Sequence, residues 1–357
     1  MAEIAIKSRI YLDHAATTPA CAAALAALAE AAAITGNPSS IHAGGRAANG
    51  IIERARDAIA AWAGCRPGGI VFTSGGSEAL ALALNTPWRV LAGATEHSAV
   101  LAARPDAVLI GADGDGIIDM AALDSALAAG PALVAIQHAN NETGVIQPVG
   151  EIAARVAAAG GRLLVDAVQS AGKVPLPDAD YVAISAHKLG GTPGTGALIA
   201  RNVETLAAVQ RGGGQERGLR GGTPNLPGIA AFAAAITAAT DWHQIAALRD
   251  ALEARLQTRI HGANAQRLPN ISSIALPGVA STVQVMTLDL AGFMVSAGAA
   301  CSSGKVANSH VLAAMGLGEA AGQAIRVSLG PQTSAAEVAA FGDAWLAMAA
   351  RHAKVAA

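Results

Sequence analysis

Short runs rich in Val, Ile and Leu recur along this chain, and alanine-rich stretches separate them. Each run has the length of a buried strand, and the stretches between them have the composition of helices. The runs are GIVFTS (69–74), DAVLIGA (106–112), ALVAIQHA (132–139), GRLLVDA (161–167), YVAISAH (181–187) and GALIA (196–200). This alternation is typical of a mostly parallel sheet with helices on both faces, so it predicts an α/β fold.

The pattern changes after a long helical stretch that runs from Pro227 to about Ile260. Beyond it, ISSIALPG (271–278) and AIRVSLG (324–330) have the pattern of strands, and a terminal helix is expected from about Ser334. A chain of 357 residues exceeds what one hydrophobic core usually serves. We therefore expect a large α/β domain (15–245) and a smaller α+β domain (1–14 plus 246–357), with a hinge near residue 245.

Charge and composition exclude several classes of protein. The formal net charge is −2, and no block of like charges occurs, so the chain has no electrostatic footprint for nucleic acid or an anionic membrane. No run of about 18 strongly apolar residues exists, and the first residues, MAEIAIKSRIYLDH, lack the pattern of a secretory signal. We expect a cytoplasmic protein. The three cysteines, Cys21, Cys65 and Cys301, have the spacing of neither a disulfide framework nor a zinc site.

One of the few lysines of the chain follows the run at 181–185, in SAHKLGG (185–191). Asp166 ends one predicted strand and Lys188 follows the next, so neighbouring parallel strands bring both charges to one edge of the sheet. An amine and a carboxylate there suit pyridoxal 5′-phosphate, because the lysine forms a Schiff base and the acid keeps the pyridine nitrogen protonated. A structural ion pair is the alternative that these two residues leave open.

The stretch TSGGSEA (73–79) is a candidate phosphate cradle. A strand leads into glycines and a hydroxyl and then into a helix, whose free N–H groups favour an anion. Gly75, Gly76 and Ser77 would surround the phosphate, and Ser185 and His187 could donate further hydrogen bonds. Taken alone, a glycine-rich turn before a helix is more often only a turn.

Ten motifs together resemble those of cysteine desulfurases of the NifS/IscS type, in the class V aminotransferase group of fold-type I pyridoxal phosphate enzymes. They stand in family order along nearly the whole chain: YLDHAATTP (11–19), GNPSSIHAGGR (36–46), FTSGGSEA (72–79), TEHSAV (95–100), ANNETGVIQPV (139–149), VDAVQSAGK (165–173), SAHKLGG (185–191), GGGQERGLRGGTPN (212–225), SAGAACSSG (296–304) and IRVSLG (325–330). The resemblance implies a seven-stranded type of mostly parallel sheet between helices, with a smaller α+β domain. It also implies a homodimer.

The resemblance implies a role for each matching residue. Lys188 would form the Schiff base, Asp166 would pair with the pyridine nitrogen, and His97 would stack on the cofactor as a catalytic residue. The phosphate would be held by Gly76, Ser77, Ser185 and His187, and by Thr223 from the other subunit. Gln169 would hydrogen-bond the phenolic oxygen, Asn140 would contact cofactor and substrate, and Arg326 would bind the substrate carboxylate together with Asn37. Without the shared pattern, structural roles in the core, in turns or in ion pairs would be preferred for His97, His187, Asn140, Gln169 and Arg326.

Cys301 stands in AGAACSSGKVANSH (297–310), a stretch of small and polar residues that suits a loop. On loop composition alone, a tolerated surface cysteine is as good an interpretation as a nucleophile, and the resemblance favours the nucleophile. Lys188 would remove the Cα proton of L-cysteine, and the Cys301 thiolate would then take the substrate sulfur as a persulfide, releasing L-alanine. Lys305 and His310 are candidates to lower the pKa of this thiol.

The expected function is therefore a cysteine desulfurase that passes sulfur to an acceptor protein of iron–sulfur cluster assembly or of thiolation. Some positions depart from the family pattern, among them Leu80 and Ala81, where an asparagine pair is usual. Two alternatives stay open at this point. One keeps the cofactor but changes the reaction to that of a selenocysteine or cysteine sulfinate lyase or a class V transaminase, and the other is a catalytically inactive binding subunit.

Overall fold

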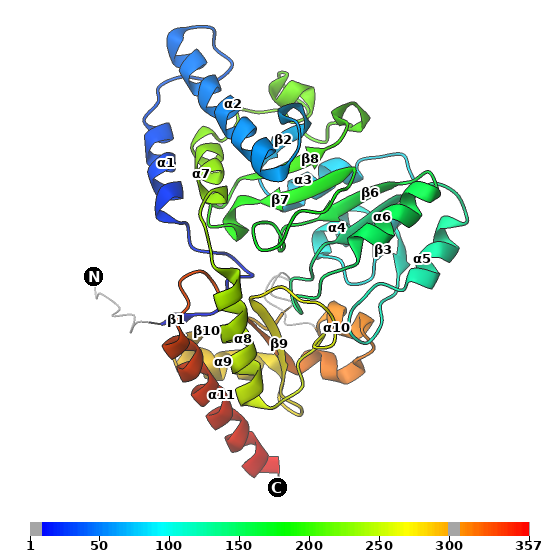
Figure 1. Cartoon of the computed structure of the whole chain (residues 1–357), viewed down its shortest axis with the longest axis vertical. Helices are drawn as coiled ribbons and strands as arrows, with labels where there is room; N and C mark the ends of the chain where they lie inside the picture. The colour runs from blue at the N-terminus through cyan, green and yellow to red at the C-terminus, as the bar shows by residue number, and fades with distance from the viewer. Residues whose placement is uncertain (1–8, 299–307, 357) are drawn as a thin grey trace.

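The Val- and Ile-rich runs form one seven-stranded sheet in the computed structural model, which describes residues 9–298 and 308–356. The strand order is β2-β8-β7-β6-β5-β3-β4 (Figure 1). The strands are β2 (Ile70–Thr73), β3 (Val90–Gly93), β4 (Val108–Ile110), β5 (Leu133–Gln137), β6 (Arg162–Asp166), β7 (Tyr181–Ser185) and β8 (Gly196–Ala200). Only β8 runs against its neighbours, so the predicted mostly parallel sheet is confirmed.

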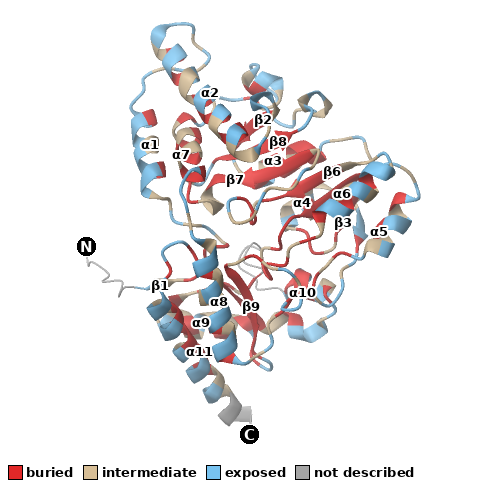
Figure 2. Ribbon diagram, in the orientation of Figure 1, coloured by how far each residue is buried: buried red, intermediate tan, exposed pale blue. Residues whose placement is uncertain are grey.

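Helices cover both faces of this sheet, as Figure 2 shows by the buried strands at its centre. Successive residues of a strand point to opposite faces, and in β5 Val134 and Ile136 enter one core while Leu133 and Ala135 enter the other. Burial on both faces explains why the inner runs are apolar at every position rather than at alternate ones, whereas the edge strand β4 exposes Val108 and Leu109. The first core is completed by α2 (Ala43–Ala63), α5 (Met120–Leu127), α6 (Val149–Ala158) and α7 (Leu226–Ile236), and the second by α3 (Gly76–Leu84) and α4 (Ser98–Ala103).

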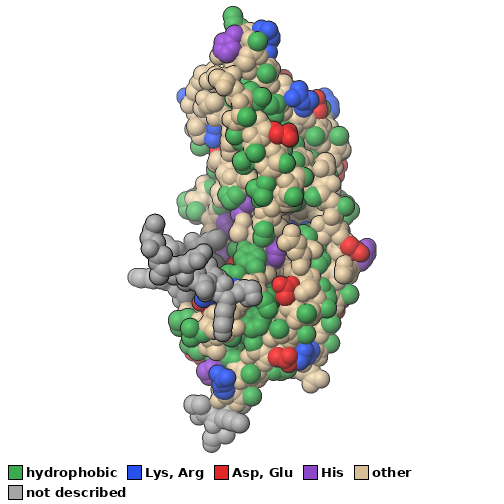
Figure 3. Space-filling view, turned by 90° about the vertical axis from the view of Figure 1, so that its left-hand side faces the viewer, with side chains coloured by type: hydrophobic (Ala, Val, Ile, Leu, Met, Phe, Trp, Pro, Cys, Tyr) green, Lys and Arg blue, Asp and Glu red, His purple; other side chains and the backbone are tan. Residues whose placement is uncertain are grey.

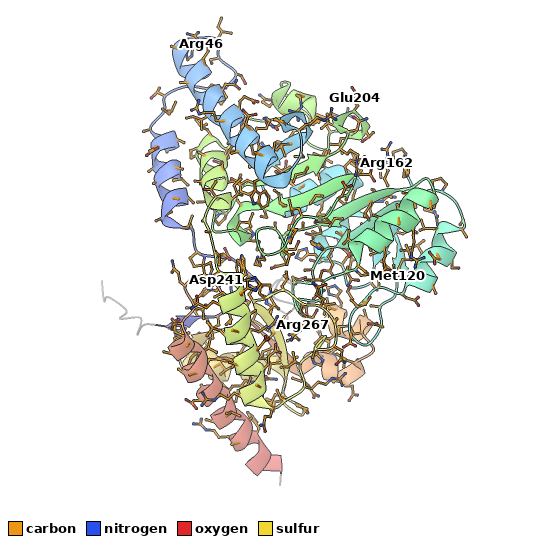
Figure 4. The ribbon with its side chains drawn as sticks, in the orientation of Figure 1. Arg46, Met120, Arg162, Glu204, Asp241 and Arg267 are labelled. Carbon is orange, nitrogen blue, oxygen red and sulfur yellow. The ribbon has the colours of Figure 1, made fainter. Side chains whose placement is uncertain are left out.

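Two features of the sheet region differ from the sequence prediction. Strand β3 was not predicted, because its four residues, VLAG, carry only one β-branched side chain. The single helix expected from Pro227 to Ile260 is two helices, α7 and α8 (Trp242–Leu256). A capping residue causes the break between the two helices. The Asp241 side chain accepts hydrogen bonds from the backbone N–H groups of His243 and Gln244, so a new helix, α8, begins after it (Figure 4).

A separate hydrophobic core lies in the lower part of Figure 1. Strands β9 (Ile271–Ala275) and β11 (Ala324–Ser328) pair antiparallel there, and β1 (Ile10–Tyr11) pairs parallel with β10 (Phe293–Met294). The helices of this part are α8, α9 (Ser281–Leu290), α10 (His310–Ala314) and α11 (Ala335–Ala356). The expected terminal helix is confirmed, and Ser334 and Glu337 cap it reciprocally.

Small side chains join the N-terminal segment to the sheet region. Helix α1 (Ala22–Ala32) packs on α7 through Ala24, Ala231 and Ala235.

Within the described part of the chain, no helix combines the length and the apolar character that crossing a membrane requires. Figure 3 shows charged side chains of both signs scattered over the face that it presents.

Candidate active site

A cavity of about 330 Å³ lies where β6 and β7 end, at the edge of the sheet that parallel strands make available to ligands. Side chains from both parts of the molecule line it. The sequence-predicted site residues among its lining residues are Gly76, Ser77, His97, Asp166, Gln169, Ser185, His187, Lys188 and Arg326. These predicted residues, which lie up to 250 positions apart in the chain, therefore meet in one cavity.

Lys188 reaches the cavity from a single helical turn, Ala186–Lys188, that directly follows β7. Its Nζ donates hydrogen bonds to the carbonyl oxygens of Ala15 and Ala16, at 2.5 and 2.6 Å. These adjacent carbonyls belong to the segment between β1 and α1, so one distant stretch of chain holds the amine in place. The amine lies near Asp166, as predicted, because β6 and β7 are parallel neighbours.

Asp166 is the last residue of β6 and is almost fully buried. Its Oδ1 accepts a hydrogen bond from Val168 N at 2.9 Å. Burial raises the pKa of Asp166, and the Val168 hydrogen bond and the nearby side chains of His97 and Lys188 act against that rise. An ionised carboxylate accepts several hydrogen bonds, so Asp166 can accept another from a ring N–H in the cavity.

His97 sits at the start of α4 and caps it. Its Nδ1 accepts a hydrogen bond from Ala99 N at 3.1 Å, so Nδ1 carries no proton and the proton of the neutral ring is on Nε2. The cap holds the plane of the ring against the backbone. The imidazole therefore faces the cavity in one orientation and one tautomer.

The predicted phosphate cradle is formed by the first turn of α3, between Gly75 and Ser77. A Cβ atom at Gly76 would lie 2.5 Å from Val168 Cγ2, so only glycine fits between this turn and the end of β6. Ser185 is buried beside the turn. Burial, and then the charge of Lys188, lower the pKa of His187 to about 4, so its ring is neutral at pH 7 and shares a hydrogen bond with Thr17 Oγ1.

Two amide side chains of the predicted site differ in their surroundings. Gln169 lines the cavity, its Nε2 donates to Ala15 O at 2.8 Å, and its buried Oε1 has no hydrogen-bond partner. Asn140 is instead used within its own turn, where its Oδ1 accepts from the backbone N–H groups of Glu142 and Thr143. The neighbour, Asn141, is the asparagine that lines the cavity.

Arg326, in the middle of β11, forms the opposite side of the cavity. Its Nη2 pairs with Asp13 Oδ1 at 2.8 Å, and its Nη1 donates to Asn141 O at 3.0 Å. The guanidinium is buried, and its Nε–H finds no hydrogen-bond partner among the residues that the structure describes. A buried donor of this kind favours an anionic ligand.

The remaining predicted residues lie outside this cavity or outside the described residues. Asn37 is exposed in the loop between α1 and α2, where its Oδ1 accepts from Ser39 N. Thr223 is exposed and lines a different, much smaller cavity beside Ser74 and Arg220. Cys301 and Lys305 belong to residues 299–307, which the structure does not describe.

Sequence reasoning missed three buried charged residues beside the cavity. Glu96 accepts a hydrogen bond from Gln137 N at 2.7 Å, and burial raises its pKa well above the usual range. Burial also raises the pKa of Glu142, and burial with the nearby Lys188 lowers that of Lys173 to about 7. All three stand inside motifs quoted above (TEHSAV, ANNETGVIQPV and VDAVQSAGK), and a charged residue within four positions of a predicted site residue is the signal that could have found them.

Comparisons with known proteins agree along nearly the whole chain. A family model described as aminotransferase class-V matches residues 10–341. The chain is 40% identical to a cysteine desulfurase of Cereibacter sphaeroides, over 92% of this chain and 93% of that one. A solved NifS-like protein from Rickettsia africae is similar with a TM-score of 0.88 and 31% identity, covering 95% of this chain and 99% of the other. A structure described as SspA in complex with cysteine has a TM-score of 0.80 and 27% identity, covering 91% and 100%.

Proposed function

The chain belongs to the aminotransferase class-V family, and we propose that within it this protein is a pyridoxal 5′-phosphate-dependent cysteine desulfurase that converts L-cysteine to L-alanine. The observation that carries the proposal is the 40% identity to a cysteine desulfurase over 92% of the chain. Lyase and transaminase alternatives have no comparable support among these relatives, and the fold is the α/β fold of fold-type I enzymes.

The residues around the cavity fit the cofactor. Gly76, Ser77, Ser185 and His187 offer a phosphate the backbone turn, hydroxyls and imidazole that an anion prefers. The unpartnered Oε1 of Gln169 can accept a hydrogen bond from a phenolic O–H. When bound, pyridoxal 5′-phosphate supplies an aldehyde for Lys188 and an aromatic ring that draws electrons from the substrate Cα.

The chain's own groups then bind the substrate and move protons. Arg326 binds the carboxylate of L-cysteine through its guanidinium. The Nζ of Lys188 takes the Cα proton, and a half-buried amine oriented by two carbonyl oxygens at the cavity wall is well placed to take and return a proton. Asp166 would hold the ring nitrogen of the bound cofactor in its protonated form, and His97, with its tautomer fixed by Ala99 N, would contact the cofactor ring.

Cys301 carries the sulfur step in this proposal. Its thiolate forms an S–S bond with the substrate sulfur as the substrate C–S bond breaks, and the electron pair of that bond stays with the carbon. Protonation of the carbon skeleton yields L-alanine, so the carbon is reduced and the sulfur is oxidised to the persulfide level. The persulfide is then passed to a sulfur-acceptor protein of iron–sulfur cluster assembly or thiolation.

The wider organisation is also proposed. The chain forms a homodimer in which Thr223 and Asn37 serve the partner's cavity, which is supported by their exposure and their position away from the cavity of their own chain. The sheet region and the part around β9 and β11 are two domains divided near residue 245, supported by the packing of Ile245 in the separate core of that second part. The protein acts in the cytoplasm on L-cysteine, without contacting nucleic acid or a membrane.

The test is to incubate the purified protein with pyridoxal 5′-phosphate, L-cysteine and a reductant and to measure alanine and sulfide together. Equal amounts of both products are expected from the wild type. The Cys301→Ser variant should lose desulfuration, whereas Cys65→Ser, at a half-buried cysteine of the sheet region, should keep it. Alanine without sulfide, or neither product, would contradict the proposal.

A further inference from the structure

The carboxylate of Glu142 lies against two segments that stand on either side of residues 299–307. Ser309 Oγ donates a hydrogen bond to Glu142 Oε2 at 2.5 Å. On the other side, a Cβ atom at Gly298 would lie 2.6 Å from the same oxygen, and Gly298 has a positive φ of 81°. The backbone of Gly298 therefore passes directly over the carboxylate, and only glycine fits there.

Glu142 is itself held rigidly. It is 3% exposed, and its N–H donates to Asn140 Oδ1 at 2.8 Å within the turn that follows Ala139. Gly144 completes this turn with a positive φ of 77°, and its N–H bonds Asn140 O. A buried carboxylate on such a turn has a well-defined position, so other segments of the chain can be positioned by contact with it.

Burying this carboxylate has a cost, because burial raises the pKa of Glu142. The hydrogen bond from Ser309 opposes the rise, as do the nearby positive charges of His310, Arg326 and His97. Arg326 already has a carboxylate partner in Asp13. The need to neutralise Arg326 therefore does not by itself explain why the carboxylate of Glu142 is buried. The contacts of Glu142 with Gly298 and Ser309 do explain it.

Ser309 links this carboxylate to a helix as well. Its Oγ accepts a hydrogen bond from Leu312 N at 3.0 Å and so caps α10, which packs through Val311 and Leu312. Gly298 lines the cavity. Glu142 therefore lies against both points at which the chain enters and leaves residues 299–307: it accepts a hydrogen bond from Ser309 and lies in close contact with the backbone of Gly298.

We propose that Glu142 is a positioning residue of the desulfurase reaction, whose carboxylate holds Gly298 and Ser309 and thereby sets where the segment bearing Cys301 joins the wall of the cavity. This inference rests on the proposed function. It assigns Glu142 to the sulfur step and not to substrate binding or to the proton transfer at Cα. Losing the anchor should therefore slow persulfide formation and leave the earlier steps nearly unchanged.

The test compares these two stages in single-turnover experiments on the holoenzyme. The change in absorbance of the bound cofactor on mixing with L-cysteine reports the early steps, and mass spectrometry of quenched samples reports the persulfide on Cys301. For Glu142→Ala we expect the first rate within about twofold of the wild type and the second lower by roughly 10- to 100-fold, since small displacements of a reacting group have effects of this size.

Two further variants sharpen the test. Glu142→Gln keeps an oxygen that accepts from Ser309 and should recover most of the lost rate. Ser309→Ala removes the same contact from the other side, so the effects of Ser309→Ala and Glu142→Ala should be non-additive when combined. Should Glu142→Ala fail to fold, Ser309→Ala carries the comparison of the two stages alone.

Equal slowing of both stages, or unchanged persulfide formation in Glu142→Ala or Ser309→Ala, would overturn the inference. The proposed function fails separately, because a wild-type protein without alanine and persulfide would contradict the desulfurase activity whatever the variants do. Thermal melting and cofactor absorbance of each variant confirm that the comparison is made between folded holoenzymes.

Discussion

The two sides of the cavity hold their functional groups in different ways. On the side formed by β6, β7, α3 and α4, the groups are fixed by backbone: Asp166 by Val168 N, His97 by Ala99 N and Lys188 by two carbonyl oxygens. On the side formed by β11 and the turn after Ala139, side chains hold side chains, as Asp13 holds Arg326 and Ser309 meets Glu142. The contacts of Asp166 and His97 follow from local sequence, whereas those of Lys188, Arg326 and Glu142 arise only when distant segments meet.

Lys188→Ala should have the largest effect, because it removes the one amine on the backbone-fixed side that can both bind the cofactor and move the Cα proton. We expect alanine formation to fall by at least about 10³-fold, the upper range for a general base. The measurement is the rate of alanine formation at saturating L-cysteine. A residual rate within tenfold of the wild type would show that another base serves the reaction.

Arg326→Lys tests the side-chain-fixed side. A lysine keeps the charge but not the planar fork, so the contacts with Asp13, Asn141 O and the substrate carboxylate are not all possible together. We expect kcat/KM for L-cysteine to fall by roughly 10- to 100-fold, mostly through KM. Arg267→Lys is the matched control, because Arg267 also grips a carboxylate, that of Glu253, but does not line the cavity (Figure 4). Equal losses in both variants would point to stability rather than substrate binding.

Gly76→Ala tests the close approach of α3 to β6. The added Cβ would meet Val168 Cγ2 at 2.5 Å and push the phosphate cradle away. We expect the dissociation constant for pyridoxal 5′-phosphate to rise by about tenfold, as overpacking costs of 1–3 kcal/mol imply. Titration of the apoprotein, followed by absorbance, measures this constant.

Two controls accompany this titration. Val168→Ala in the Gly76→Ala background should restore much of the cofactor affinity by making room for the methyl group. Gly68→Ala should have no effect, because a Cβ there meets nothing within 4 Å. No recovery in the double variant would mean that Gly76 matters for a reason other than space.

The smallest expected effect is on stability in acid. Burial lowers the pKa of His261 and of His138 to about 4, against 6.5 for an ordinary histidine. Between these values the unfolded chain binds more protons than the folded chain, so the free energy of unfolding falls as the pH falls through this window.

His261 and His138 differ in their partners. Within residues 9–298 and 308–356, both ring nitrogens of His261 lack a hydrogen-bond partner, whereas His138 Nδ1 shares a hydrogen bond with Ser170 Oγ at 2.9 Å. His261→Leu should therefore raise the free energy of unfolding at pH 5 by about 1 kcal/mol relative to its effect at pH 7, after allowance for screening by solvent. Denaturant unfolding at both pH values measures it, with the exposed His243→Leu as control. An equal effect at both pH values would contradict the pKa assignment.

Much of the sheet region could be predicted from the sequence, because strands buried on both faces must be apolar throughout. Strand β3 could not be predicted because Leu, Ala and Gly have weak strand preferences, and its conformation is decided by pairing with β4 and β5. The break between α7 and α8 escaped because one capping residue, Asp241, decides it. A single cap weighs little in a long helical pattern, although it ends one helix and starts another.

The candidate site was also only partly predictable from the sequence. Asp166 and Lys188 follow strand ends, so their meeting was predictable from the parallel sheet. Which of Asn140 and Asn141 faces the cavity depends on the direction of one tight turn, and motif position alone does not determine it. Glu96 and Glu142 went unnoticed because their surroundings, Gln137 and Ser309, come from other parts of the chain.

The contact of Gly298 with Glu142 also limits the distance from this point at which the sulfur of Cys301 can lie. Cys301 is three positions beyond Gly298, and extended chain spans about 3.3–3.6 Å per residue, so its backbone stays within roughly 11 Å of that point. If the proposed function is correct, a persulfide formed on Cys301 would be transferred close to Gly298. An acceptor protein would then have to bring its receiving atom to the surface around Gly298.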